Sequence, residues 1–399
     1  MNLIALAGML AVVRSAAAAP AQKEKDSPRP YSSIGSQGVS YVGPGREATY
    51  DLTGPIIRIG LLAPLQGPRK ADGKAIIAAA QLALHDASRR PLPGGRRVVL
   101  AMGDQSGPAW GRLGDVIIHL VLDEHVIAVV TSASGATTHL TEQIGNKIGV
   151  PILTLSTDAT TTQIDLPWIF RLGPSDALQA KVIAQDIYRA RGLQRVLLVT
   201  EHDHDGRVGG EEFQIAARLL GAPRPACLLI NPLQPDSDSL LALLKTKSPQ
   251  AIVFWARSEN ARKLLQQIRA GGVHTPIYLS QEAAQQGLGL GFLLPVAAVG
   301  QERESPGIWT VASGQAGSPL RERFARRYQL STGMFPTPVA AEAYDAVQLI
   351  VQGLREAGPN RARVRDRIAS VRDSSGVSGT ISFDDEGNNR ASLRLVRLR

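Results

Sequence analysis

The chain has 399 residues, which is too long for one ordinary hydrophobic core and favours two domains. Hydrophobic residues make up 44% and charged residues 20%, as in soluble globular proteins, and an aromatic content of 5% counts against a stacking surface for sugars or bases. The formal net charge is +9, but the Lys and Arg residues form no block longer than two or three. Because nucleic-acid binding needs clustered charge, we expect no nucleic-acid partner.

The N-terminal region predicts export. An apolar run in residues 1–19 is too short for a membrane span and ends in small residues that suit signal-peptidase cleavage, although no basic residue precedes it. Residues 20–54 are rich in Pro, Gly, Ser and charge and are expected to form a flexible tether. The only cysteine, Cys227, lies in an apolar run, so we expect a buried thiol, no disulfide framework and no lipid anchor. The sequence therefore predicts a periplasmic or otherwise extracytoplasmic location.

From Ile56 onward, apolar strand-like runs alternate with helical segments. The expected strands are 56–62, 97–102, 126–131, 152–155, 168–172, 196–200, 227–230, 251–255, 277–280, 296–300 and 308–312. The expected helices are 74–88, 113–124, 139–150, 177–191, 211–220, 239–244, 259–270, 320–328, 339–356 and 361–371. This alternation predicts an α/β fold with two doubly wound lobes, each a parallel sheet covered by helices on both faces.

The end of the chain has a different pattern. The runs 379–383 and 392–398 flank an acidic turn, 384–389, and are expected to form a terminal hairpin. The turn lacks the Asp-x-Asp-x-Asp-Gly spacing of a calcium loop. These late elements are too few for a third domain and are expected to complete the two lobes.

Two strand ends carry clusters of hydroxyl residues. The first cluster contains Ser132, Ser134 and Thr137, and the second contains Ser156, Thr157 and Asp158. In a parallel sheet both clusters lie at the carboxyl edge, where open α/β sheets bind ligands. Hydroxyl groups and free N–H groups at helix N-termini suit a small anion such as a carboxylate, so the clusters predict a ligand site. The alternative is that these hydroxyls only cap helices.

Several short segments are informative through their order and spacing. They are the strand and loop 57–68, the helix end 81–87, the two hydroxyl clusters, the Phe-Arg segment 168–176, the helix segment 341–347 and the segment 379–384. In this order they resemble the type I periplasmic binding proteins, specifically the branched-chain amino-acid (Leu/Ile/Val) binding family of ABC transporters. The resemblance spans residues 56–399.

The resemblance implies two lobes joined by three crossing segments, near residues 173–177, 302–307 and 376–379, with hinge closure over a ligand in the cleft. Lobe 1 would comprise 55–174 and 307–376, and lobe 2 would comprise 175–306 and 377–399. In the family, hydroxyls and main-chain N–H groups of the first lobe hold the ligand's carboxylate and ammonium groups. Carried over, these roles fall on Ser132, Ser134, Thr137, Ser156, Thr157 and Asp158, with Thr160 as an alternative to Asp158.

The facing loops depart from the family pattern. Asp72 lies in the first loop, where the family often has an aromatic residue, and Asp205 and Ser258 lie where tyrosine is common. Glu282 falls where the family can place an acid that pairs with an ammonium group. Because a buried acid against an apolar ligand costs several kcal/mol unless paired, this site suits a cationic or polyhydroxylated ligand better than leucine.

Enzyme signatures are missing from the sequence. There is no Gly-x-Gly-x-x-Gly after the first strand, no P-loop lysine motif and no Gly-x-Ser-x-Gly elbow. The pair His202 and His204 would place two rings on one side of an extended segment, as metal sites often need, but no third ligand stands at a characteristic spacing. We therefore interpret 201–206 as a solvated loop and expect no catalytic residue, no metal and no cofactor.

The sequence suggests three functions, in order of preference. The first is a non-catalytic, monomeric solute-binding protein that captures a small polar, amino-acid-like ligand for an ABC permease. The second is a regulatory or sensory ligand-binding domain of the same fold that acts on an envelope partner. The third is an α/β hydrolase that uses the loop from His202 to Asp205.

Overall fold

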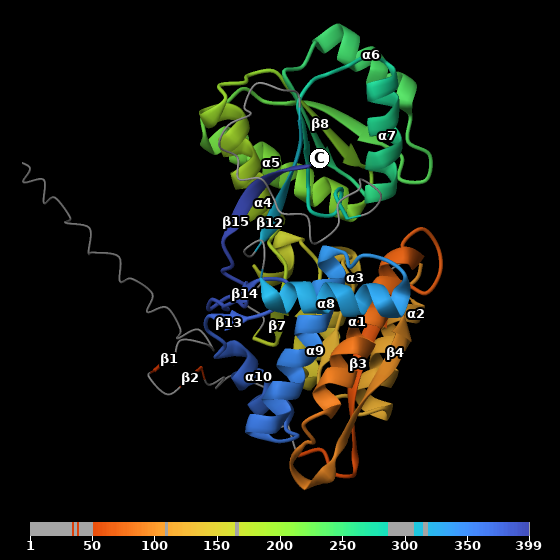
Figure 1. The fold of residues 1–399 in the computed structure, drawn as a ribbon, viewed down its shortest axis with the longest axis vertical. Helices are drawn as coiled ribbons and strands as arrows, with labels where there is room; N and C mark the ends of the chain where they lie inside the picture. The colour runs from red at the N-terminus through yellow and green to blue at the C-terminus, as the bar shows by residue number, and fades with distance from the viewer. Residues whose placement is uncertain are drawn as a thin grey trace, which may run out of the picture.

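The computed structural model describes residues 51–107, 111–163, 167–285, 307–313 and 318–398, together with the backbone of two short strands, β1 (Ile34–Gly35) and β2 (Gly38–Val39). These residues form two α/β lobes, which lie one above the other in Figure 1 and confirm the predicted fold class. The predicted signal peptide 1–19, most of the predicted tether 20–54 and the expected strand 296–300 lie outside the described residues. None of the described helices has both the length and the hydropathy needed to span a bilayer.

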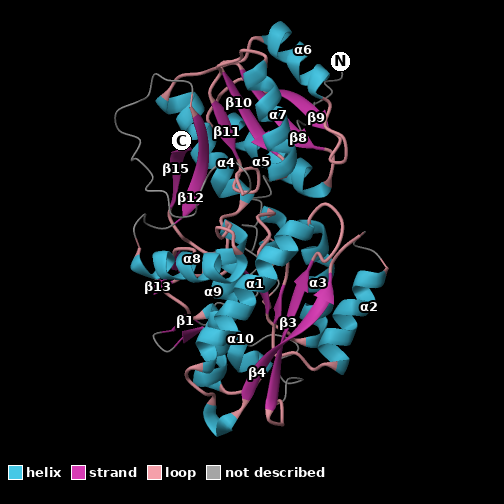
Figure 2. Ribbon diagram, turned by 45° about the vertical axis from the view of Figure 1, so that its right-hand side comes forward, coloured by secondary structure: helices cyan, strands magenta, loops and turns pink. Residues whose placement is uncertain are grey.

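The first lobe is built on a five-stranded parallel sheet in the order β4-β3-β5-β6-β7. Its strands are β3 (Ile56–Ala63), β4 (Arg97–Asp104), β5 (Val129–Val130), β6 (Ile152–Thr154) and β7 (Ile169–Arg171). Its helices are α1 (Lys70–Ser88), α2 (Arg112–Ile118), α3 (Gly135–Ile148), α8 (Pro319–Thr332), α9 (Pro338–Ala357) and α10 (Arg361–Ala369). Helices α1 and α9 bury one face of this sheet, and α2 and α3 bury the other (Figure 2).

The second lobe is built on a six-stranded sheet in the order β15-β12-β11-β10-β8-β9, in which only β15 is antiparallel to its neighbour. Its strands are β8 (Val196–Glu201), β9 (Ala226–Ile230), β10 (Ala251–Trp255), β11 (Ile277–Leu279), β12 (Ile308–Ser313) and β15 (Leu393–Leu398). Its helices are α4 (Asp176–Ala184), α5 (His204–Leu219), α6 (Ser237–Lys247) and α7 (Ser258–Ala270). Helices α4 and α5 cover one face, and α6 and α7 the other.

Helix α5 starts seven residues before the expected helix 211–220. Asp203 caps it, because its side chain accepts a hydrogen bond of 2.9 Å from the Gly206 N–H group. Glycines at 206, 209 and 210 obscure the helical pattern in the sequence, yet they let this helix pack closely on Glu201, Trp255 and Thr200. The segment interpreted as a solvated loop therefore carries His204 and Asp205 on the first turn of a helix that faces the first lobe.

The chain passes between the sheets at places that differ in part from expectation. It leaves β7 of the first lobe and enters α4 of the second between Arg171 and Asp176. Residues 307–313, expected in lobe 1, lie in lobe 2, because β12 pairs with β11. Val377 and Phe383, expected in lobe 2, are buried in the first core, so the last return to lobe 2 comes after them.

The expected terminal hairpin between 379–383 and 392–398 is wrong. The first run contains β14 (Thr380–Ile381), which pairs with β13 (Ser374–Ser375). The second run is β15, which pairs with β12 of the other lobe instead of with its neighbour in sequence. The turn between them stays a turn, because the Asp384 carboxylate accepts hydrogen bonds from backbone N–H groups of Glu386 and Asn388.

Two burial predictions also fail. Cys227 is exposed, because β9 is an edge strand whose successive side chains alternate between the core and solvent. Leu52, expected in the tether, is buried in the first core, and its N–H group donates to the Pro359 carbonyl at 2.7 Å. The packed part of the first lobe therefore begins before β3.

Gly73 sets the approach of α1 to the loop that follows β3. A Cβ atom at this position would lie 1.8 Å from the Pro64 carbonyl oxygen, far inside contact distance. Glycine thus lets the first turn of α1 lie directly on that loop, and this turn carries side chains that face the second lobe.

We predict that Gly73→Ala destabilises the protein by about 1–3 kcal/mol, because the backbone at Pro64 has to move. The matched control is Gly114→Ala in α2, where an added Cβ meets no atom within 4 Å. That change should alter stability by at most about 1 kcal/mol. Thermal unfolding of both variants checks this, and equal melting temperatures would contradict the role given to Gly73.

Candidate functional site

Arg69 links the two lobes through ion pairs. It directly precedes α1 of the first lobe, and its guanidinium group reaches two acids of the second lobe. Nη2 lies 3.0 Å from Asp205 Oδ2, and Nη1 lies 2.6 Å from Glu282 Oε1 in an ion pair that lacks hydrogen-bond alignment. Asp72 of α1 lies 3.9 Å from the same nitrogen. Three of the predicted site residues are thus gathered around one cation.

These charges are largely withdrawn from water, which changes their protonation equilibria. Burial raises the pKa of Asp205 to about 7, although Arg69 acts in the opposite direction. Burial also acts to lower the pKa of Arg69, but Glu282, Asp205 and Asp72 outweigh it and raise that pKa above its usual value. Asp205 Oδ1 accepts a further hydrogen bond of 2.8 Å from the Gly135 N–H group at the start of α3, where the helix dipole favours an anion.

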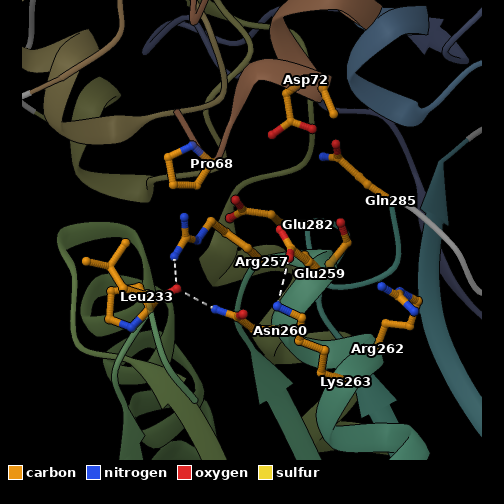
Figure 3. A pocket seen from close by; sticks show the side chains of 13 residues that line it. Pro68, Asp72, Leu233, Arg257, Glu259, Asn260, Arg262, Lys263, Glu282 and Gln285 are labelled. Carbon is orange, nitrogen blue, oxygen red and sulfur yellow. Dashed lines mark hydrogen bonds and ion pairs between the residues drawn. The ribbon is translucent and has the colours of Figure 1, made fainter. Parts of the chain in front are cut away.

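A cavity of about 460 Å³ opens beside this ion-pair cluster (Figure 3). Its lining combines acids, bases, amides and a few apolar side chains: Pro68, Ala71, Asp72, Pro232, Leu233, Arg257, Ser258, Glu259, Asn260, Arg262, Lys263, Glu282 and Gln285. Asp72 and Pro68 come from the first lobe, and most of the remaining side chains come from the second. Asp72, Ser258 and Glu282, all predicted from the sequence, line this cavity.

One wall of the cavity is held in place by a hydrogen-bonded network. Arg257 donates to Glu201 Oε2 at 2.9 Å and to the Pro232 carbonyl at 2.5 Å. Asn260 donates to Glu201 Oε1 at 2.6 Å and to the same Pro232 carbonyl at 2.9 Å, so both side chains point to one oxygen in Figure 3. Glu201 is buried, and the network supplies its partners. The first turn of α7 is therefore rigidly presented to the cavity.

The first hydroxyl cluster is occupied by bonds within its own lobe. The Ser132 N–H group donates to Gln105 Oε1 at 3.2 Å, and the Ser132 hydroxyl accepts from the Ser134 N–H group at 3.4 Å. The Thr137 hydroxyl donates to the Ser134 carbonyl at 3.1 Å. These bonds shape the start of α3, and none of the three residues lines the cavity beside Arg69.

The second hydroxyl cluster is organised by Arg171, whose side chain is fully buried. Its guanidinium group donates to the carbonyl oxygens of Ser156 and Asp158 and so fixes the loop after β6. The Ser156 hydroxyl accepts from the Asp158 N–H group at 3.1 Å. The Thr157 carbonyl accepts from the Asp176 N–H group at 2.7 Å, which ties this loop to the first crossing segment.

Asp158 forms a second contact between the lobes. Its Oδ2 atom lies 2.7 Å from Nε2 of His204 in α5 and 3.4 Å from Nε2 of His139 in α3. Its Oδ1 atom accepts hydrogen bonds from the N–H and hydroxyl groups of Thr160, at 2.8 and 2.6 Å. Burial acts to raise the pKa of Asp158, but hydrogen bonds with His139, Thr160 and His204 lower it below its usual range. This acid is therefore an anion that holds an imidazole from each lobe.

A third contact lies near the crossing segments. Gln281, which comes soon after β11, donates from Nε2 to Glu342 Oε1 of α9 at 2.7 Å, and its N–H group donates to Gln179 in α4. Burial raises the pKa of Glu342 to about 8, although the hydrogen bond from Gln281 opposes this shift. A Cβ atom on Gly173 would lie 2.8 Å from the Glu342 carboxylate, so only glycine fits there without displacing this acid.

The structure thus brings together some predicted residues and separates others. Asp72, Asp205 and Glu282 surround Arg69, Ser258 shares the cavity with two of them, and Asp158 lies in a separate contact. Sequence reasoning assigned no role to Arg69, Arg257 or His139. Arg69 lies in the loop after the first strand, three residues before Asp72. This spacing is the one signal in the sequence that could have marked Arg69 as the partner of an acid.

We predict that the buried Glu342 makes stability depend on pH. Its pKa in the folded protein, about 8, lies above its ordinary value of 4.5, so the stabilisation is full below about pH 4.5 and is lost as pH rises through about 8. Glu342→Gln imitates the protonated acid. Its melting temperature should equal that of the wild type at about pH 5 and exceed it at about pH 9. The control Glu322→Gln changes an acid on α8 that is 44% exposed and should show no such trend. A melting-temperature difference that stays constant over this range would contradict the assignment.

Known proteins share this architecture. Residues 56–399 match the model of a family described as periplasmic binding protein. The Leu/Ile/Val-binding protein BraC3 of Rhizobium johnstonii is 24% identical over 304 residues, which are 76% of this chain and 80% of BraC3.

Two solved structures are similar in fold. One is the branched-chain amino-acid transporter substrate-binding protein LivJ of Streptococcus pneumoniae in complex with isoleucine, with 23% identity, a TM-score of 0.71, and coverage of 86% of this chain and 99% of LivJ. The other is an ABC-transporter solute-binding protein of R. palustris in complex with benzoate, with 17% identity, a TM-score of 0.74, and coverage of 86% and 93%.

The family consists of extracytoplasmic solute-binding proteins, which are not enzymes. Its model covers the whole chain from Ile56 onward, in agreement with the two-lobe fold and with the resemblance found in the sequence. The chain therefore belongs to the periplasmic binding protein family.

Proposed function

We propose that this protein captures a small polar, amino-acid-like ligand between its lobes and delivers it to an ABC permease. The observation that carries the proposal is the cavity of about 460 Å³, whose walls bear both acids and bases. Its volume lies in the range of small-molecule pockets, roughly 300–1,000 Å³. Membership of a family of solute-binding proteins supports capture without chemical conversion.

The cavity offers partners for both ends of a zwitterion. Asp72 and Glu282 supply carboxylate oxygens that can accept hydrogen bonds from an ammonium group. Arg257 and the Ser258 hydroxyl supply donors, and the first turn of α7 supplies the positive end of a helix dipole for a carboxylate. The two sets lie on the same cavity, so a single small ligand would span them.

The lining also restricts the rest of the ligand. Its apolar members are Pro68, Ala71, Pro232 and Leu233, and no aromatic side chain is among the described residues that line the cavity. A large apolar side chain would displace water from the charged group of Arg262 and from the ion pair of Lys263 with Glu259. A short or polar side chain fits this wall better than that of leucine or isoleucine.

The acids also bear on the choice between an amino acid and a simple carboxylic acid. An aromatic acid, such as the benzoate of the R. palustris protein, could use the Arg257 side of the cavity. It would bring no cation to Glu282 and Asp72, both of which lie beside Arg69 in the structure. The acidic wall therefore favours a ligand that carries an ammonium group. The hydroxyl clusters, in this proposal, support α3 and the loop after β6 and do not touch the ligand.

Isothermal titration calorimetry on the purified protein, with a panel of amino acids and with benzoate, tests this proposal. At least one polar amino acid should bind one molecule per chain, and Glu282→Gln should weaken that binding at least about tenfold, or ~1.4 kcal/mol. The matched control is Glu259→Gln, since Glu259 also lines the cavity but is 57% exposed and paired with Lys263 at 2.8 Å. It should change the affinity by about twofold or less, as expected for a surface ion pair.

Two results would contradict the proposal. If benzoate binds and no amino acid does, with the affinity unchanged in Glu282→Gln, the ligand is an aromatic acid. If Glu259→Gln and Glu282→Gln weaken amino-acid binding equally, the acidic wall acts through general charge and not through contact with an ammonium group.

A further inference from the structure

A group of metal-ligand side chains lies at the lobe interface, apart from the solute cavity. His139 of α3 and Asp158 of the loop after β6 belong to the first lobe, and His204 of α5 belongs to the second. One ligand atom from each residue can be chosen so that all three lie within 4.8 Å of one another. None of the three residues lines the cavity assigned to the solute, so metal binding here can be tested separately from the proposed function.

The distances are close to those of a metal site. Bonds of about 2.0–2.2 Å in a tetrahedral zinc site separate neighbouring ligand atoms by about 3.4 Å. Asp158 Oδ2 lies 3.4 Å from His139 Nε2 and 2.7 Å from His204 Nε2. The His139 and His204 rings stand nearly perpendicular, at 82°, with centroids 5.7 Å apart, so they meet the shared oxygen from different directions. Small side-chain rotations would bring the three atoms onto one ion.

The surrounding contacts orient the ligands as metal sites require. Glu142 Oε1 lies 2.6 Å from His139 Nδ1 and fixes the ring, so that Nε2 faces both the Thr160 hydroxyl, at 2.9 Å, and Asp158 Oδ2, at 3.4 Å. A carboxylate behind a metal-binding histidine is a usual second layer of a zinc site. Thr160 occupies Asp158 Oδ1 with two hydrogen bonds, which leaves Oδ2 as the atom that faces both imidazoles. Glu142 and Asp158 are each only 1% exposed.

We propose that His139, Asp158 and His204 bind a divalent transition-metal ion of the zinc type. Two imidazoles and one carboxylate suit Zn²⁺, whereas Ca²⁺ and Mg²⁺ require sets of oxygen ligands. Three protein ligands leave a fourth position for water, as in open zinc sites. The carboxylates of Asp158 and Glu142 supply negative charge next to the ion.

Because its ligands come from both lobes, a bound metal ion would link the two lobes. His204 is the only one of the three ligands that comes from the second lobe. All three residues can hold the ion only while the two lobes are in contact. When the lobes separate, the ion loses His204 as a ligand. Metal binding therefore shifts the lobes toward closure, because a ligand stabilises the state for which it has higher affinity.

Calorimetric titration of ZnCl₂ into untagged, chelator-treated full-length protein tests the site. The wild type should bind one Zn²⁺ per chain, CaCl₂ should give no signal, and Co²⁺ should develop the visible absorption of a four-coordinate ion. His204→Ala, at a side chain that is 33% exposed, should reduce Zn²⁺ affinity more than 100-fold without loss of folding. Glu142→Gln, which alters only the support of His139, should weaken Zn²⁺ about 10- to 100-fold.

The control is His119→Ala, which removes an exposed histidine beside Asp123 and Glu124 on the first lobe. It should leave the affinity for Zn²⁺ unchanged. The proposal is overturned if the wild type binds no stoichiometric Zn²⁺, or if His119→Ala and not His204→Ala abolishes binding. Circular dichroism of each variant without metal shows whether the variant is folded. If His204→Ala does not fold, Asp158→Asn, which keeps the shape of the side chain, gives a second test of the ligand set.

Discussion

The contact between the two lobes depends on pairs of opposite charge, with one partner from each lobe. A buried carboxylate or guanidinium group is costly unless a partner of opposite charge lies beside it. Arg69 pairs with Asp205 and Glu282 across the cleft, and Asp158 pairs with His204. Each of these pairs joins a residue of one lobe to a residue of the other, so the charge pattern contributes to how the lobes face each other.

Near the crossing segments, the contact between the lobes is a hydrogen bond and not an ion pair. Gln281 donates this bond to Glu342, and close packing around Gly173 leaves room for that acid alone. Because burial raises the pKa of this acid to about 8, the acid is neutral at neutral pH and does not compete with the ion pairs for counter-charges. The contact near the crossing segments is therefore weakly charged, whereas the contacts around Arg69 and Asp158 are strongly charged.

Much of the fold could be predicted, because alternating apolar runs and amphipathic helices specify parallel α/β layers. The failures lie where distant residues compete for one partner. β15 follows a turn after β14 but pairs with β12, and periodicity cannot show which of two edges a strand will join. Three glycines hid the start of α5, although Asp203 caps it. Asp72 and Asp205 were found because they depart from the pattern of the family that the chain resembles, and Glu282 because it falls where that family can place an acid. Arg69 and His139 were missed because their partners are set by how the lobes meet.

Small-angle X-ray scattering of the ligand-free protein and of Arg69→Met tests the central claim most directly. If Arg69 neutralises the acids that face each other in the cleft, its loss removes the cation that lies between Asp72, Asp205 and Glu282. Their mutual repulsion should open the lobes, and the variant should show a larger radius of gyration than the wild type at low salt and approach it as salt screens the charges. An unchanged or smaller radius of gyration in Arg69→Met would contradict the account.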